Sequence, residues 1–208
     1  MARKTRAEAL LTRDSLIDAA ERLIEQKGLS RTSLQDIASA AGMTRGAIYW
    51  HFKDKRDLVD AMMCRAFLPY EQALMRLDSD DRAAPLERLR RHAQRVFEHV
   101  LADVQLRRFL EITSHKVEHV DELDDAIRAR QVRLRNQHVA LIERCLYTAG
   151  LPPAKLADLA LGLHALLDGL IQNWLLSPHA FDLIEVGRSA VDAFLSGLDP
   201  VFREGPSV

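Results

Sequence analysis

Four side chains in a short run near the amino terminus are suited to hydrogen-bond a phosphate backbone or the edges of bases: Arg45, Tyr49, His51 and Lys55. An arginine guanidinium can donate two hydrogen bonds to guanine O6 and N7 together. Tyrosine and histidine can donate to phosphate oxygens, and a lysine that opens a helix adds its ammonium group to the helix N-terminus. The chemistry that these residues favour is contact with double-stranded DNA.

Two short helices are expected to position these side chains. Ser33 and Asp36 have the spacing of a helix N-cap, and Gly42 ends the helix that they begin, because glycine tolerates a left-handed backbone. Thr44 can cap a second helix. This pattern predicts a helix-turn-helix, in which the second helix enters the DNA major groove. The same spacing also occurs in all-helical proteins that bind no DNA.

The predicted DNA contacts lie at the start of the first of these helices, on the outward face of the second and at the start of the next helix. Ile48 and Phe52, four residues apart, are expected to point inward. The aromatic residues around them could instead be ordinary packing. The predicted contact residues are Ser33, Thr44, Arg45, Gly46, Ala47, Tyr49, Trp50, His51 and Lys55.

A preceding helix is expected to supply the surface on which this pair packs. Its apolar residues recur at helical spacing from Leu16 to Ile24, with Thr12 as the predicted cap and Gly28 at the end. Residues 1–11 form a basic arm, which is either a solvated terminus or a segment that lies along the DNA backbone or minor groove. The expected three-helix core comprises Ile17, Leu23, Leu34, Ile37, Ile48 and Phe52.

Gly28, the Ile37-Ala38 pair and the run GAIYWHF at residues 46–52 fall at a specific spacing. On these residues the chain, from near Thr12 to near Asp60, closely resembles the DNA-binding domain of TetR-family repressors. The resemblance implies DNA contacts at the positions named above. We therefore predict an all-α chain of about nine helices, with a helix-turn-helix domain at residues 1–56 and a ligand-binding and dimerisation domain at residues 57–208.

The charge distribution fits a protein that contacts phosphate at one end. The net charge of the 208 residues is −1. Residues 1–58 hold 11 Lys and Arg against 8 Asp and Glu, and the remainder holds 18 against 22. Such a protein is expected to have a basic helix-turn-helix domain, called the head below, and an acidic ligand-binding domain, called the body.

Other classes of function find little support in the sequence. There is no nucleophile–base pair, no metal-ligand spacing and no glycine-rich phosphate loop, so we predict no enzyme, no cofactor and no metal. Cys64 and Cys145 are predicted to be buried free thiols of a reducing compartment. The start of the chain lacks a signal peptide, and no stretch reaches the ~18 apolar residues of a membrane span. The predicted location is the cytoplasm, without membrane contact.

The body is expected to be helical throughout, because no run alternates apolar and polar residues as a strand does. Helices are predicted from near Lys55 to Tyr70, from Pro85 to Val104, over residues 106–119, 122–149 and 154–176, and from Leu183 onward. Pro69 removes a backbone donor, which predicts a kink near Arg65. Such a kink either transmits motion between body and head or is a static bend.

The last two predicted helices indicate a homodimer. Residues 154–176 are apolar almost all round, and a helix without a solvent face is buried on both sides. In a chain of this size one side would pack on the body and the other on a second copy, giving a four-helix bundle about a two-fold axis. Two heads would then read a palindromic operator with half-sites roughly 34–36 Å apart or a multiple of that spacing.

One polar stripe, His164, Asp168 and Gln172, runs along that apolar helix. It is either an intrahelical His–Asp pair at a cavity edge or at the dimer seam, or the polar anchor of a ligand cavity in an apolar body. Each of the other histidines of the body, taken alone, is interpreted as structural.

The segments Glu111-Ile112, His115-Lys116 and 168–178 are similar to the AcrR-like repressors of multidrug efflux pumps. That resemblance implies a small hydrophobic ligand and a repressor of an efflux or detoxification operon that the ligand releases. An activator or a ligand-independent DNA-binding protein of the same fold is the alternative. Carried over by position, the ligand-binding residues are Phe67, Val96, Leu110, Ser114, Leu141, His164, Leu167, Asp168 and Ile171.

Overall fold

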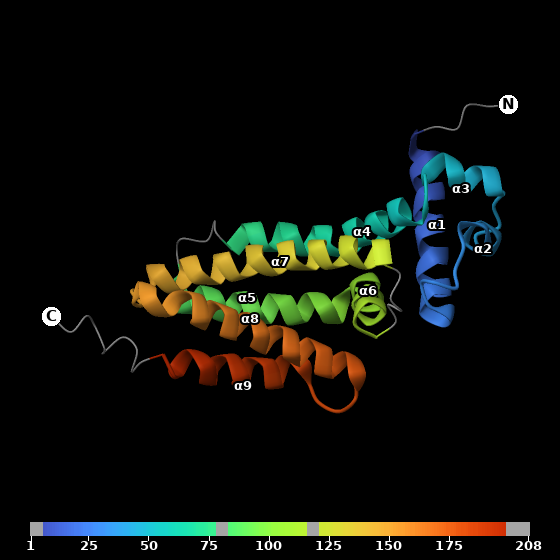
Figure 1. Cartoon of the computed structure of the whole chain (residues 1–208). Helices are drawn as coiled ribbons and strands as arrows, with labels where there is room; N and C mark the ends of the chain where they lie inside the picture. Colours follow the sequence, from blue (N-terminus) through green and yellow to red (C-terminus); the bar gives the residue numbers. More distant parts are fainter. Residues whose placement is uncertain (1–5, 78–82, 116–120, 199–208) are drawn as a thin grey trace. The chain divides into compact units, whose positions relative to one another are not determined.

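The computed structural model describes residues 6–77, 83–115 and 121–198, and describes their side chains except at 68–77, 112–115 and 121–127. Over these ranges the chain is nine helices with no strand (Figure 1), which confirms the predicted all-α fold. The helices are α1 (Arg6–Lys27), α2 (Leu34–Ala40), α3 (Arg45–His51), α4 (Lys55–Leu77), α5 (Pro85–Ala102), α6 (Val104–His115), α7 (Asp121–Thr148), α8 (Pro153–Leu176) and α9 (Leu183–Ser196).

The helices belong to two compact units. The first unit comprises Met1–Leu68 with Gln105–Ala129, and the second comprises Pro69–Val104 with Arg130–Val208. The helix α4 therefore begins in the first unit and ends in the second, and α7 does the same. Most of α6 belongs to the first unit together with the amino-terminal helices.

The helix-turn-helix of the first unit forms for the reasons expected from its sequence. The Ser33 side chain accepts a hydrogen bond from the Asp36 amide at 3.1 Å, and the Asp36 carboxylate accepts one from the Ser33 amide at 3.0 Å, which completes a capping box. Thr44 accepts from the Ala47 amide and caps α3. The glycine at position 42 has φ 68°, the left-handed conformation that the turn requires.

The predicted core of these three helices is confirmed at five of its six positions. Ile17, Leu34, Ile37, Ile48 and Phe52 are buried, and Leu23 is half-buried. The helix α2 packs on both α1 and α3. The recognition helix is therefore held by apolar contacts on its inner side, which leaves its outer side to solvent.

Two local predictions in the head region are wrong. The helix α1 already includes Arg6, so Thr12 does not cap it and instead donates to the Glu8 carbonyl at 2.8 Å within the helix. Residues 6–11 of the predicted arm are therefore helical, and residues 1–5 lie outside the described residues. Cys64 is exposed on α4 rather than buried, because it falls on the solvent side of that helix, whereas Cys145 is buried as expected.

The helix α4 continues through Pro69 to Leu77, so the proline does not end it. The kink expected near Arg65 stays a prediction. The helix α5 has Pro85 at its first turn, where the missing amide hydrogen costs nothing. Gly150, with φ 90°, follows α7 and precedes the two prolines that open α8.

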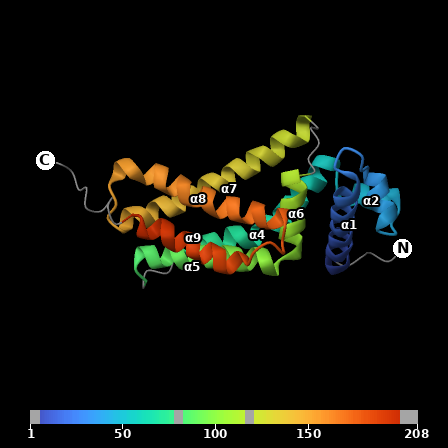
Figure 2. The same cartoon turned by 90° about the horizontal axis from the view of Figure 1, so that it is seen from below.

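In the second unit, α5, α8 and α9 pack on one another, as the two views show (Figures 1 and 2). At Gly187 of α9, an added Cβ atom would overlap the ring of Phe97 on α5. Arg90 donates to Asp192 at 2.8 Å and joins the same two helices at the surface. The face of α5 against α9 is therefore fixed both by a glycine-sized space and by an ion pair.

Candidate functional site

The outward face of α3 carries the polar and aromatic side chains that the sequence places there. Ile48 is fully buried, and this orientation turns Arg45, Gly46, Tyr49 and Trp50 toward solvent. Trp50 is 73% exposed, which excludes the packing interpretation for this aromatic residue. The remaining predicted contacts of α3, Ala47 and His51, are half-buried.

Tyr49 has a second role, because the Arg45 guanidinium lies 5.6 Å from the centre of its ring. A cation over an aromatic face is attracted to it, by about 0.5–1 kcal/mol at exposed sites. The ring therefore limits the positions that the Arg45 side chain explores. An arginine held in this way is prepared to present both of its donors to one base.

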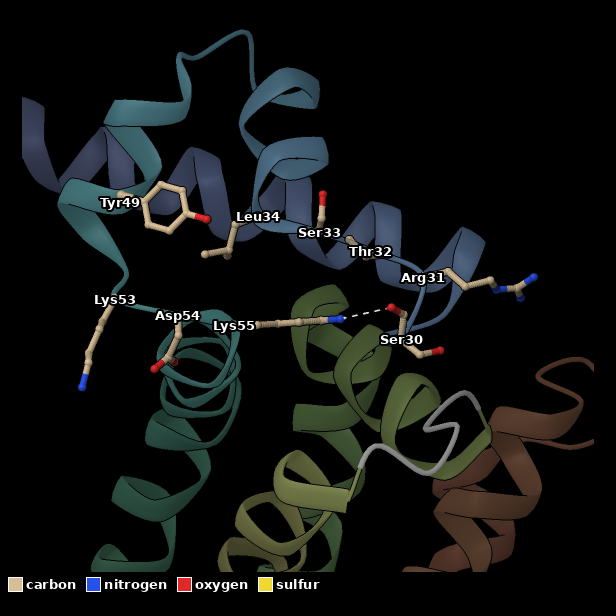
Figure 3. A pocket seen from close by; sticks show the side chains of 9 residues that line it. All are labelled: Ser30, Arg31, Thr32, Ser33, Leu34, Tyr49, Lys53, Asp54 and Lys55. Carbon is tan, nitrogen blue, oxygen red and sulfur yellow. Dashed lines mark hydrogen bonds between the residues drawn. The ribbon is translucent and has the colours of Figure 1, made fainter.

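An open hollow of about 470 Å³ lies beside α3, between the loop before α2 and the turn before α4 (Figure 3). The Tyr49 hydroxyl and the Lys55 ammonium group both point into the region between these segments. Besides the predicted contacts Ser33, Tyr49 and Lys55, four residues of the lining have a positive charge or a hydroxyl group: Ser30, Arg31, Thr32 and Lys53. The full lining is Ser30, Arg31, Thr32, Ser33, Leu34, Tyr49, Lys53, Asp54 and Lys55.

Lys55 is a partly buried cation of this hollow. Its Nζ donates to the Ser30 carbonyl at 3.4 Å, and burial lowers its pKa. Its position at the start of α4 adds the partial positive charge of a helix N-terminus. A phosphate oxygen placed here would favour the charged lysine and occupy the helix N-terminus at once.

The structure separates the roles of the two predicted hydroxyl contacts. The Ser33 hydroxyl donates to the Asp36 carboxylate at 2.7 Å, and this bond, the largest cause, lowers the pKa of Asp36. A phosphate contact by the Ser33 hydroxyl would have to replace that bond. Thr44 only accepts, from the Ala47 amide at 3.3 Å, so its hydroxyl hydrogen is oriented independently of the cap.

The predicted ligand-binding residues fall in both compact units. Phe67 is buried in the first unit, with its ring edge-on to Phe109 at 5.1 Å, and Leu110 is half-buried there. Val96, Leu141, Leu167 and Ile171 are buried in the second unit. The side chain of Ser114 lies outside the described residues. The ligand-binding role of this set stays a prediction.

The second unit contains a chain of three histidines that the sequence analysis did not assemble. His92 on α5 and His138 on α7 approach through their Nε2 atoms at 2.7 Å, and His138 and His164 on α8 approach through their Nδ1 atoms at 3.0 Å. The three residues come from helices far apart in the sequence, and no spacing within one helix signals the cluster. Val96, one of the predicted ligand-binding residues, lies one turn beyond His92 on α5. The three histidines are therefore close to part of the predicted ligand-binding set.

His92 and His138 are neutral in the folded protein near pH 7. Burial lowers the pKa of His92 to about 4, with the charge of Arg95 acting in the same direction. Burial, followed by the neighbouring His92 and His164, lowers the pKa of His138 to about 2. A neutral His138 has one ring N–H, so it donates in one of its two contacts and accepts in the other.

The polar stripe of α8 meets the histidine chain at His164, and both of its expected roles stay predictions. His164 is half-buried and pairs with His138, while Asp168 is exposed on the described chain. Burial lowers the pKa of His164, and the carboxylate of Asp168 partly offsets this by raising it. The stripe therefore joins a charged outer residue to the buried histidine chain.

Two tests of other functions can be made on the described residues. Among their side chains no group of three or more His, Cys, Asp or Glu could hold a metal ion. No helix in the described ranges is long and apolar enough to cross a membrane.

Comparison with known proteins finds two families along the chain. Residues 16–62 match the family described as bacterial regulatory proteins, tetR family. Residues 84–200 match the family described as MAATS-type transcriptional repressor, C-terminal region. The two matches divide between the head and the body of the chain.

Individual relatives cover nearly the whole chain. The HTH-type transcriptional regulator AcrR of Shigella flexneri is 37% identical over 203 residues, which are 94% of this chain and 93% of that protein. The crystal structure of NalD, the secondary repressor of the MexAB-OprM multidrug efflux pump in Pseudomonas aeruginosa, superposes with a TM-score of 0.79 at 32% identity, covering 92% of this chain and 98% of that one. A complex of SmeT with triclosan superposes with a TM-score of 0.76 at 31% identity, covering 95% and 96%; SmeT is the repressor of the Stenotrophomonas maltophilia multidrug efflux pump SmeDEF.

Proposed function

We propose a function from the premise that this chain belongs to the TetR family of bacterial regulatory proteins: it is a ligand-responsive transcriptional repressor of a multidrug efflux or detoxification operon. The observation that carries the proposal is the exposed polar face of α3 beside the hollow at Lys55. A 7-residue helix with Arg45, Tyr49 and Trp50 turned to solvent has no packing role on that face. The names of the efflux-pump repressors NalD and SmeT support the choice of operon.

The DNA contacts divide into two kinds. Arg45 and the exposed residues of α3 other than Tyr49 read base edges in the major groove, while Tyr49 and Lys55 hold the phosphate backbone from the hollow. The backbone contacts fix the register of the helix on the duplex. The base contacts then decide which sequence is bound.

A homodimer would present two such heads to a palindromic operator. Support comes from α8 and α9, which keep large apolar side chains exposed at Leu161, Leu176 and Val186 in the single chain. Burial of these residues against a second copy would remove apolar surface from water. The heads of the dimer would then engage successive major-groove faces.

The ligand is a small hydrophobic molecule bound in the body. Support comes from the buried apolar residues of the predicted set, from the triclosan complex of SmeT and from the match to a repressor family over the body. The ligand binds better to a body conformation that misplaces the heads, and the operator is released because of this difference in affinity. The protein acts in the cytoplasm, where its DNA is.

A gel-shift assay tests the proposal with DNA from upstream of the gene that encodes the chain. The purified wild-type protein should shift that DNA, and triclosan should reduce the shift in a concentration-dependent way. Arg45→Ala serves as the control for specific binding. Absence of any shift by the wild type would refute repression, and a shift that persists with triclosan and with other apolar drugs would refute release by ligand.

A further inference from the structure

An acidic stripe runs along one face of α1. Its members, Asp14, Asp18, Glu21 and Glu25, recur at i, i+4, i+7 and i+11, the spacing of a single helix face. The helix that carries the stripe packs on α2, and α2 packs on α3.

One arginine of α4 is surrounded by this stripe. Arg65 Nη1 donates to Asp18 Oδ1 at 2.7 Å and lies 3.4 Å from the Asp14 carbonyl oxygen. Arg65 Nη2 lies 2.6 Å from Glu21 Oε1. A single guanidinium thus contacts two carboxylates of the stripe, those of Asp18 and Glu21, and the backbone carbonyl of Asp14. All of these residues belong to the first unit.

The inner half of this contact is buried. The side chain of Glu21 is 1% exposed and that of Arg65 is 17% exposed, whereas Asp18 is 43% exposed. Burial raises the pKa of Glu21, and the neighbouring Arg65 partly offsets that rise. The 2.6 Å contact is an ion pair whose angle does not meet the geometry of a hydrogen bond. A buried carboxylate is costly unless it is paired, so the pair is weak evidence for stability and better evidence for a defined geometry.

The contact lies where α4 leaves the first unit. Arg65 precedes Leu68, the last residue of α4 that belongs to that unit. Apolar contacts hold two helices together but are non-directional. A guanidinium that contacts α1 at three positions restricts the rotation and register of α1 on α4, and α1 packs on α2, which in turn packs on α3.

We propose that Arg65, Asp18 and Glu21 form a positioning clamp for operator recognition, which holds the DNA-reading helices at a defined angle to α4. Two heads of a dimer must meet their half-sites together, and an angle that is fixed in advance reduces the ordering cost of specific binding. Non-specific binding depends on phosphate charge and tolerates variation in that angle. The clamp rests on the proposed function, since it requires an operator to be recognised.

The test uses a double variant, Glu21→Leu with Arg65→Met, in the full-length protein. Each single change leaves a buried charge without its partner and endangers folding, whereas removing both replaces the pair by apolar side chains. The DNA probes are a duplex selected by the wild-type protein from a random library and a scrambled duplex of equal composition. Circular dichroism and sedimentation confirm that the variant is folded and has the wild-type oligomeric state, and fluorescence anisotropy gives both affinities at one salt concentration.

The ratio of the two affinities should fall at least tenfold in the double variant, through loss of binding to the selected duplex. A smaller fall, or an equal loss on both duplexes, overturns the clamp while leaving the proposed function intact. If the wild type selects no duplex at all, the proposed function fails first and the clamp with it.

Arg108→Met is the matched control. It removes another arginine that pairs with the same stripe, because Arg108 Nε on α6 lies 3.8 Å from Glu25 Oε2. Both partners of that pair are more than a third exposed, and exposed pairs of this kind contribute little. The control should keep the affinity ratio within threefold of the wild type, and a tenfold fall in it would overturn the assignment to Arg65.

Discussion

Acidification should destabilise the fold through the histidine chain of the second unit. The pKa of His92 is about 4 and that of His138 about 2 in the folded protein, against an ordinary value of 6.5 that the unfolded chain recovers. Below pH 6.5 the unfolded chain therefore binds protons that the folded protein excludes. The stability contributed by the neutral histidines is complete above that pH and is lost as the pH falls toward 4.

The expected magnitude follows from these values. Between pH 7 and pH 5, each of the two histidines should cost about 2 kcal/mol of unfolding free energy, so the pair costs about 4 kcal/mol. Single domains have about 5–15 kcal/mol in total, so this loss is a large fraction of the stability. The lowered pKa of His164 acts in the same direction, with Asp168 and Arg135 as its charged neighbours.

Urea unfolding followed by circular dichroism at pH 7, 6 and 5 measures the effect, at one protein concentration because a dimer is stabilised by association. Glu21 acts in the opposite direction, since burial raises its pKa, and other carboxylates also titrate near pH 5. The double variant His92→Leu with His138→Leu isolates the histidines, and His179→Leu, in the exposed loop after α8, is the control. An equal loss of stability in the wild type and in the double variant would refute the reasoning.

The other predictions concern DNA binding and local packing. Arg45→Ala should abolish specific operator binding in a gel shift while sedimentation shows an unchanged dimer; loss of the dimer as well would contradict the assigned division of labour. Lys55→Met should weaken binding to all sequences about equally and reduce the salt slope of the binding constant by about 1, as anisotropy over a salt series would show. Gly187→Ala should lower the unfolding free energy by about 1–3 kcal/mol, because its methyl group meets the Phe97 ring, and an unchanged urea midpoint would contradict that contact. Ser33→Ala should cost about 1 kcal/mol through loss of the capping box, measured in the same way.

Local signals account for what could be predicted of the head. The head contains capping residues, a glycine turn and apolar residues at four-residue spacing. Each of these features acts within one or two helical turns, so it can be recognised from neighbouring residues in the sequence. Thr12 does not reveal the start of α1, because a threonine can cap a helix or lie inside one, where its hydroxyl donates to the carbonyl four residues earlier. Cys64 was misplaced because an apolar run does not define which side of a helix faces solvent.

The parts that escaped prediction depend on contacts between distant residues. Each histidine of the chain, taken alone, is more often structural, and only the packing of α5, α7 and α8 brings their ring nitrogens within 3.0 Å. The contact of Arg65 with Glu21 could not be predicted for the same reason, because the two residues are 44 positions apart in the sequence. The ligand-binding assignment, the domain boundary at residue 56 and the dimer stay predictions.

The histidine chain also constrains how the body can respond to a ligand. Because a neutral His138 carries one proton, a reversal of one of its hydrogen bonds requires reversal of the other, and the two contacts change together. Two arrangements meet this condition: His138 donates to His164 and accepts from His92, or it donates to His92 and accepts from His164. A ligand that reversed one of these bonds would therefore reverse the other, and the bonds that join α8 to α7 and α7 to α5 would change together.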